Sequence, residues 1–162
     1  MKILGIDPGT TRIGYGIIRK RSDLELINYG VIEIKARDSF GRLFELGNRL
    51  VDLIDEHKPD LAGVEKLYFA KNQKTALSVS EARGVIIYTL LKKNIEVREF
   101  RPGDVKLAVA NYGLAEKQAV AIMVKKILKI DSLKGHDDAS DALAIAITAF
   151  YSKNFSDNIC VS

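Results

Sequence analysis

The chain of 162 residues contains a single cysteine and no long apolar run. One cysteine, Cys160, excludes a disulfide framework and a cysteine-based zinc site, and this scarcity is typical of a reducing compartment. The apolar stretches end well before the ~20 residues that a membrane helix needs, and no early basic-then-apolar segment resembles a secretory signal. We therefore expect a cytoplasmic protein without a membrane partner.

Internal repeats, low-complexity stretches and Pro/Ser-rich linkers are also missing from the sequence. Its length, with 47% apolar and 28% charged residues, suffices for one domain with a real core and leaves little room for a second. We expect a single domain over residues 1–153 and a flexible C-terminal tail over residues 154–162.

The basic residues are concentrated in the middle of the chain. Residues 66–129 hold thirteen basic against five acidic residues, whereas residues 1–65 hold ten against eleven and residues 130–162 two against five. A formal net charge of +4 therefore conceals a basic centre between two acidic ends. This asymmetry favours a polyanionic partner bound by the middle of the chain, although a solvated basic face would give the same count.

Hydrophobic spacing predicts the secondary structure. Short apolar runs at 2–6, 13–19 and 24–34 are separated by turns and indicate an antiparallel meander. The spacing becomes helical from 39 to 57, and strands are expected at 60–65 and 95–100 on either side of a helix at 74–93. Pro102 opens a short helix, and two further helices follow near 115–129 and 138–152. Such alternation predicts one α/β domain with a mixed sheet covered on both faces.

Two acidic residues stand at predicted strand ends. Asp7 ends the first strand and Glu65 ends the strand at 60–65. If these strands are parallel neighbours, both carboxylates lie at the edge where ligands of α/β sheets collect. Like charges at that distance are unfavourable unless a cation neutralises them. Alternatively, Asp7 only caps the turn and Glu65 is solvated.

Two more acidic residues open the last predicted helix. Asp138 and Asp141 are three residues apart and therefore project from one face, and the apolar helix behind them makes an inward carboxylate costly without a partner. Four carboxylates without cysteine favour Mg²⁺ or Mn²⁺, and a two-ion site could activate water against a phosphodiester. The neighbouring His136 fits a solvated loop better than a ligand or proton carrier.

The basic middle contains two adjacent aromatic residues. Tyr68 and Phe69, followed by Lys71, could stack on bases or wedge between them, or one could pack in the core. Lys106 and Lys117 flank a turn and could position a phosphate or offset its developing charge.

Five stretches together strongly resemble the RuvC family of Holliday-junction resolvases, endonucleases with an RNase H-like fold. The matching stretches are ILGIDPGT at 3–10, VEKLYFAKN at 64–72, EARGV at 81–85, AEKQAV at 115–120 and DASDALAIAIT at 138–148. They follow the family order over almost the whole chain. The resemblance implies an RNase H-like mixed five-stranded sheet with helices on both faces.

The resemblance also implies an activity and partners. It implies a homodimer with two Mg²⁺-dependent sites that hydrolyses two strands of a four-way junction symmetrically, in recombination and DNA repair. The branch-migration proteins RuvA and RuvB would be partners. The implied catalytic metal ligands are Asp7, Glu65, Asp138 and Asp141, with Lys106 and Lys117 in DNA binding or catalysis and Tyr68 and Phe69 near the crossover. Asp137 is an alternative ligand to Asp138.

Three other functions fit parts of the sequence. The strand end and turn at 6–11 would suit the phosphate loop of an ATP-binding protein of the actin, Hsp70 and sugar-kinase group, although those proteins need two such domains. An inert nucleic-acid-binding module on the same fold would bind through the basic middle. A different RNase H-like nuclease is the third alternative, against which the aromatic pair and the lysine spacing argue.

The helix at 74–93 is our candidate for the dimer interface. It carries Val79, Val85, Ile86 and Leu90 at helical spacing. The same residues would pack equally well onto the sheet.

Overall fold

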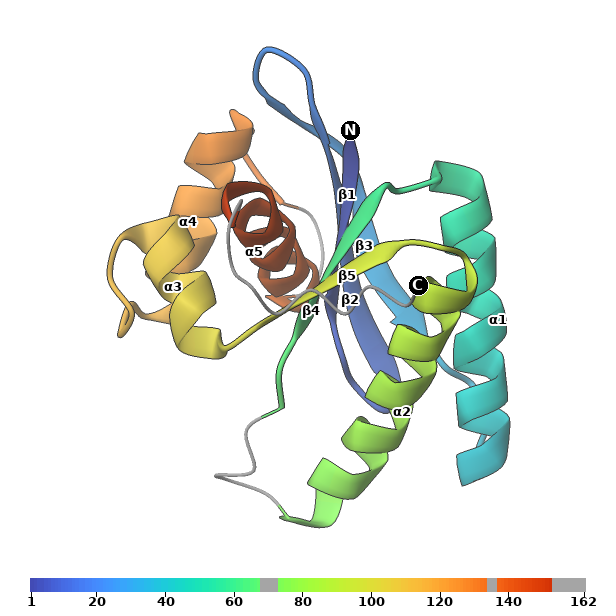
Figure 1. Cartoon of the computed structure of the whole chain (residues 1–162). Helices are drawn as coiled ribbons and strands as arrows, with labels where there is room; N and C mark the ends of the chain where they lie inside the picture. Colours follow the sequence, from blue (N-terminus) through green and yellow to red (C-terminus); the bar gives the residue numbers. More distant parts are fainter. Residues whose placement is uncertain (68–72, 134–136, 153–162) are drawn as a thin grey trace.

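The computed structural model describes residues 1–67, 73–133 and 137–152, and in these residues five strands form one sheet between two layers of helices (Figure 1). In chain order the elements are β1 (Lys2–Asp7), β2 (Arg12–Lys20), β3 (Leu24–Glu33), α1 (Ser39–His57), β4 (Leu61–Glu65), α2 (Gln73–Lys92), β5 (Glu96–Phe100), α3 (Pro102–Ala110), α4 (Lys117–Leu128) and α5 (Asp137–Tyr151). The predicted elements are confirmed, with bounds that differ by a few residues.

Strand pairing makes the sheet mixed. Its order is β3-β2-β1-β4-β5, in which β2 is antiparallel to both β1 and β3, whereas β4 is parallel to both β1 and β5. The antiparallel meander and the mixed five-stranded sheet are therefore confirmed. The parallel pairing of β1 with β4 aligns Ile6 with Val64, so the residues after them, Asp7 and Glu65, end neighbouring strands at the same edge.

Local signals set the helix ends. Asp38 accepts a hydrogen bond from the backbone N–H of Gly41 at 2.7 Å and so caps the start of α1. Lys58, directly after the last residue of the helix, adopts the left-handed conformation that ends it. Pro102 occupies the first turn of α3, where its missing N–H costs no hydrogen bond.

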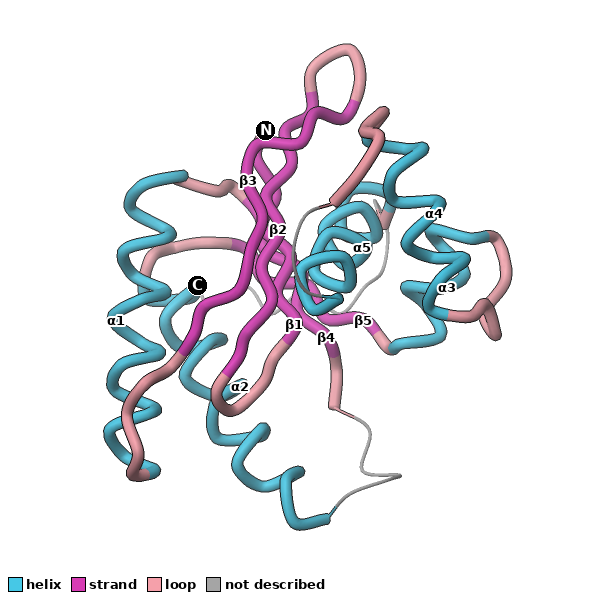
Figure 2. Tube along the Cα trace, turned by 180° about the vertical axis from the view of Figure 1, so that it is seen from behind, coloured by secondary structure: helices cyan, strands magenta, loops and turns pink. Residues whose placement is uncertain are grey.

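The two faces of the sheet bury separate cores. On one face, α1 and α2 cover Leu4, Ile6 and Val64; on the other, α5 covers Ile3 and Leu61, and α3 and α4 pack against α5. Figure 2 shows this division from behind, with α1 and α2 on one side of the strands and α3, α4 and α5 on the other.

Helix α5 lies unusually close to the central strands because glycines face it. A Cβ on Gly5 would collide with the carbonyl oxygen of Ala142, and one on Gly14 would collide with the carbonyl oxygen of Asp138. The backbone of α5 therefore rests directly on β1 and β2. This contact brings the first turn of α5 beside the end of β1, because Gly14 pairs with Asp7.

The predicted dimer interface on α2 is wrong for two of its residues. Ile86 and Leu90 are fully buried and pack with residues of α1 and the sheet, so they are not available to a partner. The exposed apolar side chains of this helix are instead Leu77 and Tyr88.

None of the helices in the described parts of the chain is long and apolar enough to cross a membrane.

Candidate active site

Two carboxylates come from neighbouring strand ends. Side chains alternate along a strand, so Gly5 and Asp7 of β1 share the α5 face, as do Gly63 and Glu65 of β4. The parallel register of β1 and β4 then sets Asp7 beside Glu65. Their charges interact strongly enough for Glu65 to raise the pKa of Asp7.

The other two carboxylates come from the start of α5. The backbone of Asp138 lies against Gly14, and Gly14 pairs with Asp7 across β1 and β2. This contact places the first turn of α5 over the end of β1. Asp138 and Asp141 both repel the charge of Asp7 and raise its pKa. The neighbouring Asp137 has a side chain that is 82% exposed, against 36% for Asp138. The structure therefore brings Asp138, rather than Asp137, toward Asp7.

The four carboxylates form a strongly acidic, partly buried cluster. Burial, followed by repulsion from Glu65 and Asp141, raises the pKa of Asp7 to about 7. Burial and repulsion from Asp141 also raise the pKa of Glu65. A divalent cation would relieve both effects, and four carboxylates are the ligand type that Mg²⁺ and Mn²⁺ prefer. The donor set therefore fits these ions.

Two basic side chains form ion pairs with the carboxylates of α5. Lys117, the first residue of α4, lies with its Nζ 2.8 Å from Asp141 Oδ2 and 3.7 Å from Asp137 Oδ2. Burial lowers the pKa of Lys117, but the hydrogen bond and the negative charge of Asp141 raise it, and the pKa is raised overall. Lys117 therefore stays protonated. The second basic side chain is Arg12, whose Nη2 lies 3.1 Å from Asp138 Oδ2. Throughout the described residues, no three acidic or histidine side chains already stand in a metal-binding arrangement.

A cavity of about 260 Å³ joins this cluster to the basic residues. Glu65 and Asp141 line it together with Lys106 and Lys117, and its remaining lining is Pro102, Val105, Val120, Ala144 and Ile145. The structure thus brings both predicted lysines to one cavity with two of the predicted carboxylates. Tyr68, Phe69, Lys71 and His136 lie outside the described residues.

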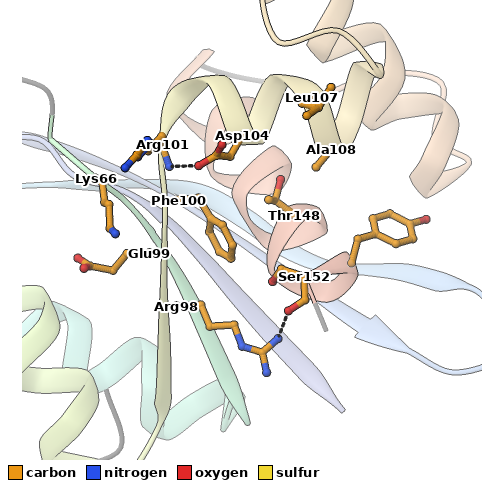
Figure 3. Close-up of a pocket in the computed structure, with 11 residues that line it drawn as sticks. Lys66, Arg98, Glu99, Phe100, Arg101, Asp104, Leu107, Ala108, Thr148 and Ser152 are labelled. Carbon is orange, nitrogen blue, oxygen red and sulfur yellow. Dashed lines mark hydrogen bonds between the residues drawn. The ribbon is translucent and has the colours of Figure 1, made fainter. Parts of the chain in front are cut away.

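A larger cavity, of about 440 Å³, lies beside β5 and α3 rather than over the carboxylates (Figure 3). At its edge Arg98 of β5 donates hydrogen bonds to the carbonyl oxygens of Ala149 and Ser152, at 3.3 and 3.0 Å, and pairs with Glu96. This guanidinium ties the C-terminal end of α5 to the sheet, so it helps to fix the helix that carries Asp138 and Asp141.

Sequence reasoning missed two features of the site. The first is Arg12, whose signal was its position at the end of the turn that follows Asp7. The second is the set of glycines that face α5. Glycine at alternate positions of the central strands, together with an alanine-rich helix, indicates that the helix packs closely on those strands.

The strand order and the helix packed on β1 and β2 place the chain in the RNase H-like class. The family model described as "Crossover junction endodeoxyribonuclease RuvC" matches residues 3–149, and the chain belongs to this family. Membership confirms the resemblance found in the sequence and excludes the two-domain ATP-binding alternative.

Individual relatives agree with the family assignment. The RuvC endonuclease of Petrotoga mobilis is 48% identical over 96% of this chain and 94% of its own, and that of Syntrophomonas wolfei is 44% identical over 96% and 92%. The structure of Thermus thermophilus RuvC superposes with a TM-score of 0.85 at 28% identity, covering 94% of this chain and 95% of that one. The same enzyme in complex with a Holliday junction substrate gives 0.84 at 26% identity, covering 94% of each chain. The predicted fold class is thereby confirmed.

Proposed function

We propose that this chain resolves four-way DNA junctions by metal-dependent hydrolysis of two strands, in recombination and DNA repair. The observation that carries the proposal is the convergence of four carboxylates from three elements beside a cavity that also contains two lysines. Family membership supports the junction as substrate, and one relative is known in complex with a Holliday junction.

Asp7, Glu65, Asp138 and Asp141 would hold Mg²⁺, which Mn²⁺ can replace, with two ions per site. Bound ions of this kind supply Lewis-acid activation of water and offset the charge of the phosphodiester. Asp7 is central to the cluster, because the other three carboxylates all repel its charge. A bound cation would therefore stabilise the ionised form of Asp7 more than that of the other three carboxylates.

The lysines act on the phosphate. Lys117 keeps its proton because it is paired with Asp141, so its ammonium group can donate to a phosphate oxygen and offset developing charge. Lys106 lines the same cavity and can contact the next phosphate along the strand. Tyr68, Phe69 and Lys71 would complete the DNA contacts near the crossover.

The assembly follows from the reaction. Cutting two related strands requires two sites at a fixed separation, which a twofold homodimer supplies. RuvA and RuvB, implied by the family resemblance, would be its branch-migration partners, and the protein would act on DNA in the cytoplasm.

The proposed function is tested with a labelled four-way junction and a linear duplex of the same sequence, each incubated with Mg²⁺ or with EDTA. We expect paired nicks in opposing strands of the junction in Mg²⁺ alone, resolved on a denaturing gel. Tight junction binding without cleavage in either buffer would contradict the proposal and favour an inert binding module.

Replacing Lys117 by Met should lower the cleavage rate on the order of 10²-fold, because a positioned charge near the phosphate is lost. Junction binding should fall only severalfold, since one phosphate contact among many disappears. Single-turnover cleavage and a binding titration measure the two effects. Lys126→Met on the same helix removes the same charge from an exposed position and is the control. Equal cleavage rates for the two variants would exclude Lys117 from the reaction.

A further inference from the structure

Arg12 is the first residue of β2 and follows the turn that begins at Asp7. It lies on the same face of the strand as Gly14, which contacts the first turn of α5. Its guanidinium reaches across to that turn, where Nη2 lies 3.1 Å from Asp138 Oδ2. The side chains are 41% and 36% exposed, so both remain accessible from solvent.

This contact neutralises one carboxylate of the acidic cluster. Glu65, Asp138 and Asp141 all repel the charge of Asp7, and Arg12 and Lys117 compensate the two of them that belong to α5. Lys117 also lines the cavity that contains Glu65, whereas the lining of that cavity does not include Arg12. The two cations therefore have different places in the site, and Arg12 lies at its margin.

A divalent cation and a guanidinium compete for the same carboxylate. An ion pair with both partners partly exposed is weak and easily broken, because water solvates the separated charges well. A guanidinium that remained on Asp138 would repel a doubly charged ion bound to the same group.

We propose that Arg12 is a displaceable counter-ion for Asp138: it compensates this carboxylate in the metal-free protein and leaves it when a divalent cation binds. The proposal rests on the proposed function, since it requires Asp138 to be a metal ligand. It makes Arg12 a positioning residue that sets the metal affinity of the site, so that the acidic cluster folds without metal yet still accepts it.

The test measures Mn²⁺ affinity in the full-length protein by electron paramagnetic resonance of free Mn²⁺, without DNA. Arg12→Gln should bind Mn²⁺ more tightly, by about 3–10-fold, because the competing charge is gone. Arg12→Lys keeps the charge and should stay within about twofold of the unchanged protein. In EDTA, Arg12→Gln should melt about 1–3 °C lower, since the carboxylates lose their compensation.

Arg19→Gln is the matched control, because Arg19 pairs with Glu25 at 2.7 Å on the same hairpin, at the other end of β2. It makes the same change of charge away from the carboxylates and should leave Mn²⁺ affinity unchanged. Equal or weaker Mn²⁺ binding by Arg12→Gln would overturn the proposal, and so would an equal gain in Arg12→Lys or Arg19→Gln. Failure of the unchanged protein to bind Mn²⁺ would instead contradict the metal site itself.

Discussion

Asp7→Asn should lose junction cleavage by at least about 10³-fold while its metal-free form becomes more stable than the unchanged protein above pH 7. The loss of cleavage follows from the position of Asp7 at the centre of the four carboxylates, where an amide is a poor ligand for a divalent cation. Single-turnover cleavage of a labelled junction in Mg²⁺ measures this effect.

The gain in stability follows from the pKa of Asp7, which burial and its acidic neighbours raise from 3.8 to about 7. The native state therefore binds this proton more tightly than the unfolded state. The free energy of unfolding falls as the pH rises from about 4 to about 7 and stays low above it. A shift of this size corresponds to at most about 4 kcal/mol, and Asn avoids the cost because it is never ionised.

Urea unfolding in EDTA at pH 5 and pH 8 compares Asp7→Asn with the unchanged protein. Between pH 5 and pH 8, the unfolding free energy of the variant should fall less than that of the unchanged protein. Asp52→Asn, which changes an exposed aspartate of α1, should keep the pH dependence of the unchanged protein. An equal fall in Asp7→Asn would show that Asp7 is not the group that destabilises the metal-free protein.

Gly5→Ala should destabilise the protein by about 3 kcal/mol or more, because the added methyl group meets backbone atoms that cannot rotate away. Its Cβ would collide with the carbonyl oxygen of Ala142 and lie 2.6 Å from the backbone nitrogen of Ala146. Helix α5 must therefore move off β1, and this movement carries Asp138 and Asp141 away from Asp7. We expect cleavage to fall even at temperatures where the variant is folded.

Gly103→Ala is the control for this substitution, because nothing lies within 4 Å of a Cβ at Gly103 in the first turn of α3. Its unfolding free energy should be unchanged or higher by up to about 1 kcal/mol. Denaturant titration measures both variants. A Gly5→Ala protein as stable as Gly103→Ala would contradict the close packing of α5 on β1.

The sequence was sufficient to predict the elements and part of the site. Strand and helix periods, with turn residues at their ends, predicted the α/β order, and the strand-end positions of Asp7 and Glu65 predicted their adjacency. Asp138 and Asp141 could be placed on one helix face by their spacing. These predictions depend on local periodicity and on one topological rule, that parallel strands end at the same edge.

Contacts between distant segments could not be predicted in the same way. The pairing of Arg12 with Asp138 depends on how close α5 approaches β2, which glycines in two strands determine together. Helix α2 carries apolar residues on several faces, so its spacing did not reveal that Ile86 and Leu90 point toward the sheet. The roles of Tyr68 and Phe69 remain predictions.

Crystals of this protein soaked in Mn²⁺ and measured at an X-ray wavelength where manganese scatters anomalously provide the most direct test. We expect anomalous peaks in contact with Asp7, Glu65, Asp138 and Asp141, and their loss in crystals of Asp7→Asn. Peaks elsewhere on the surface, or no peak beside Asp7 at Mn²⁺ concentrations that support junction cleavage, would contradict the claim that these four carboxylates form the metal site of a junction-cleaving nuclease.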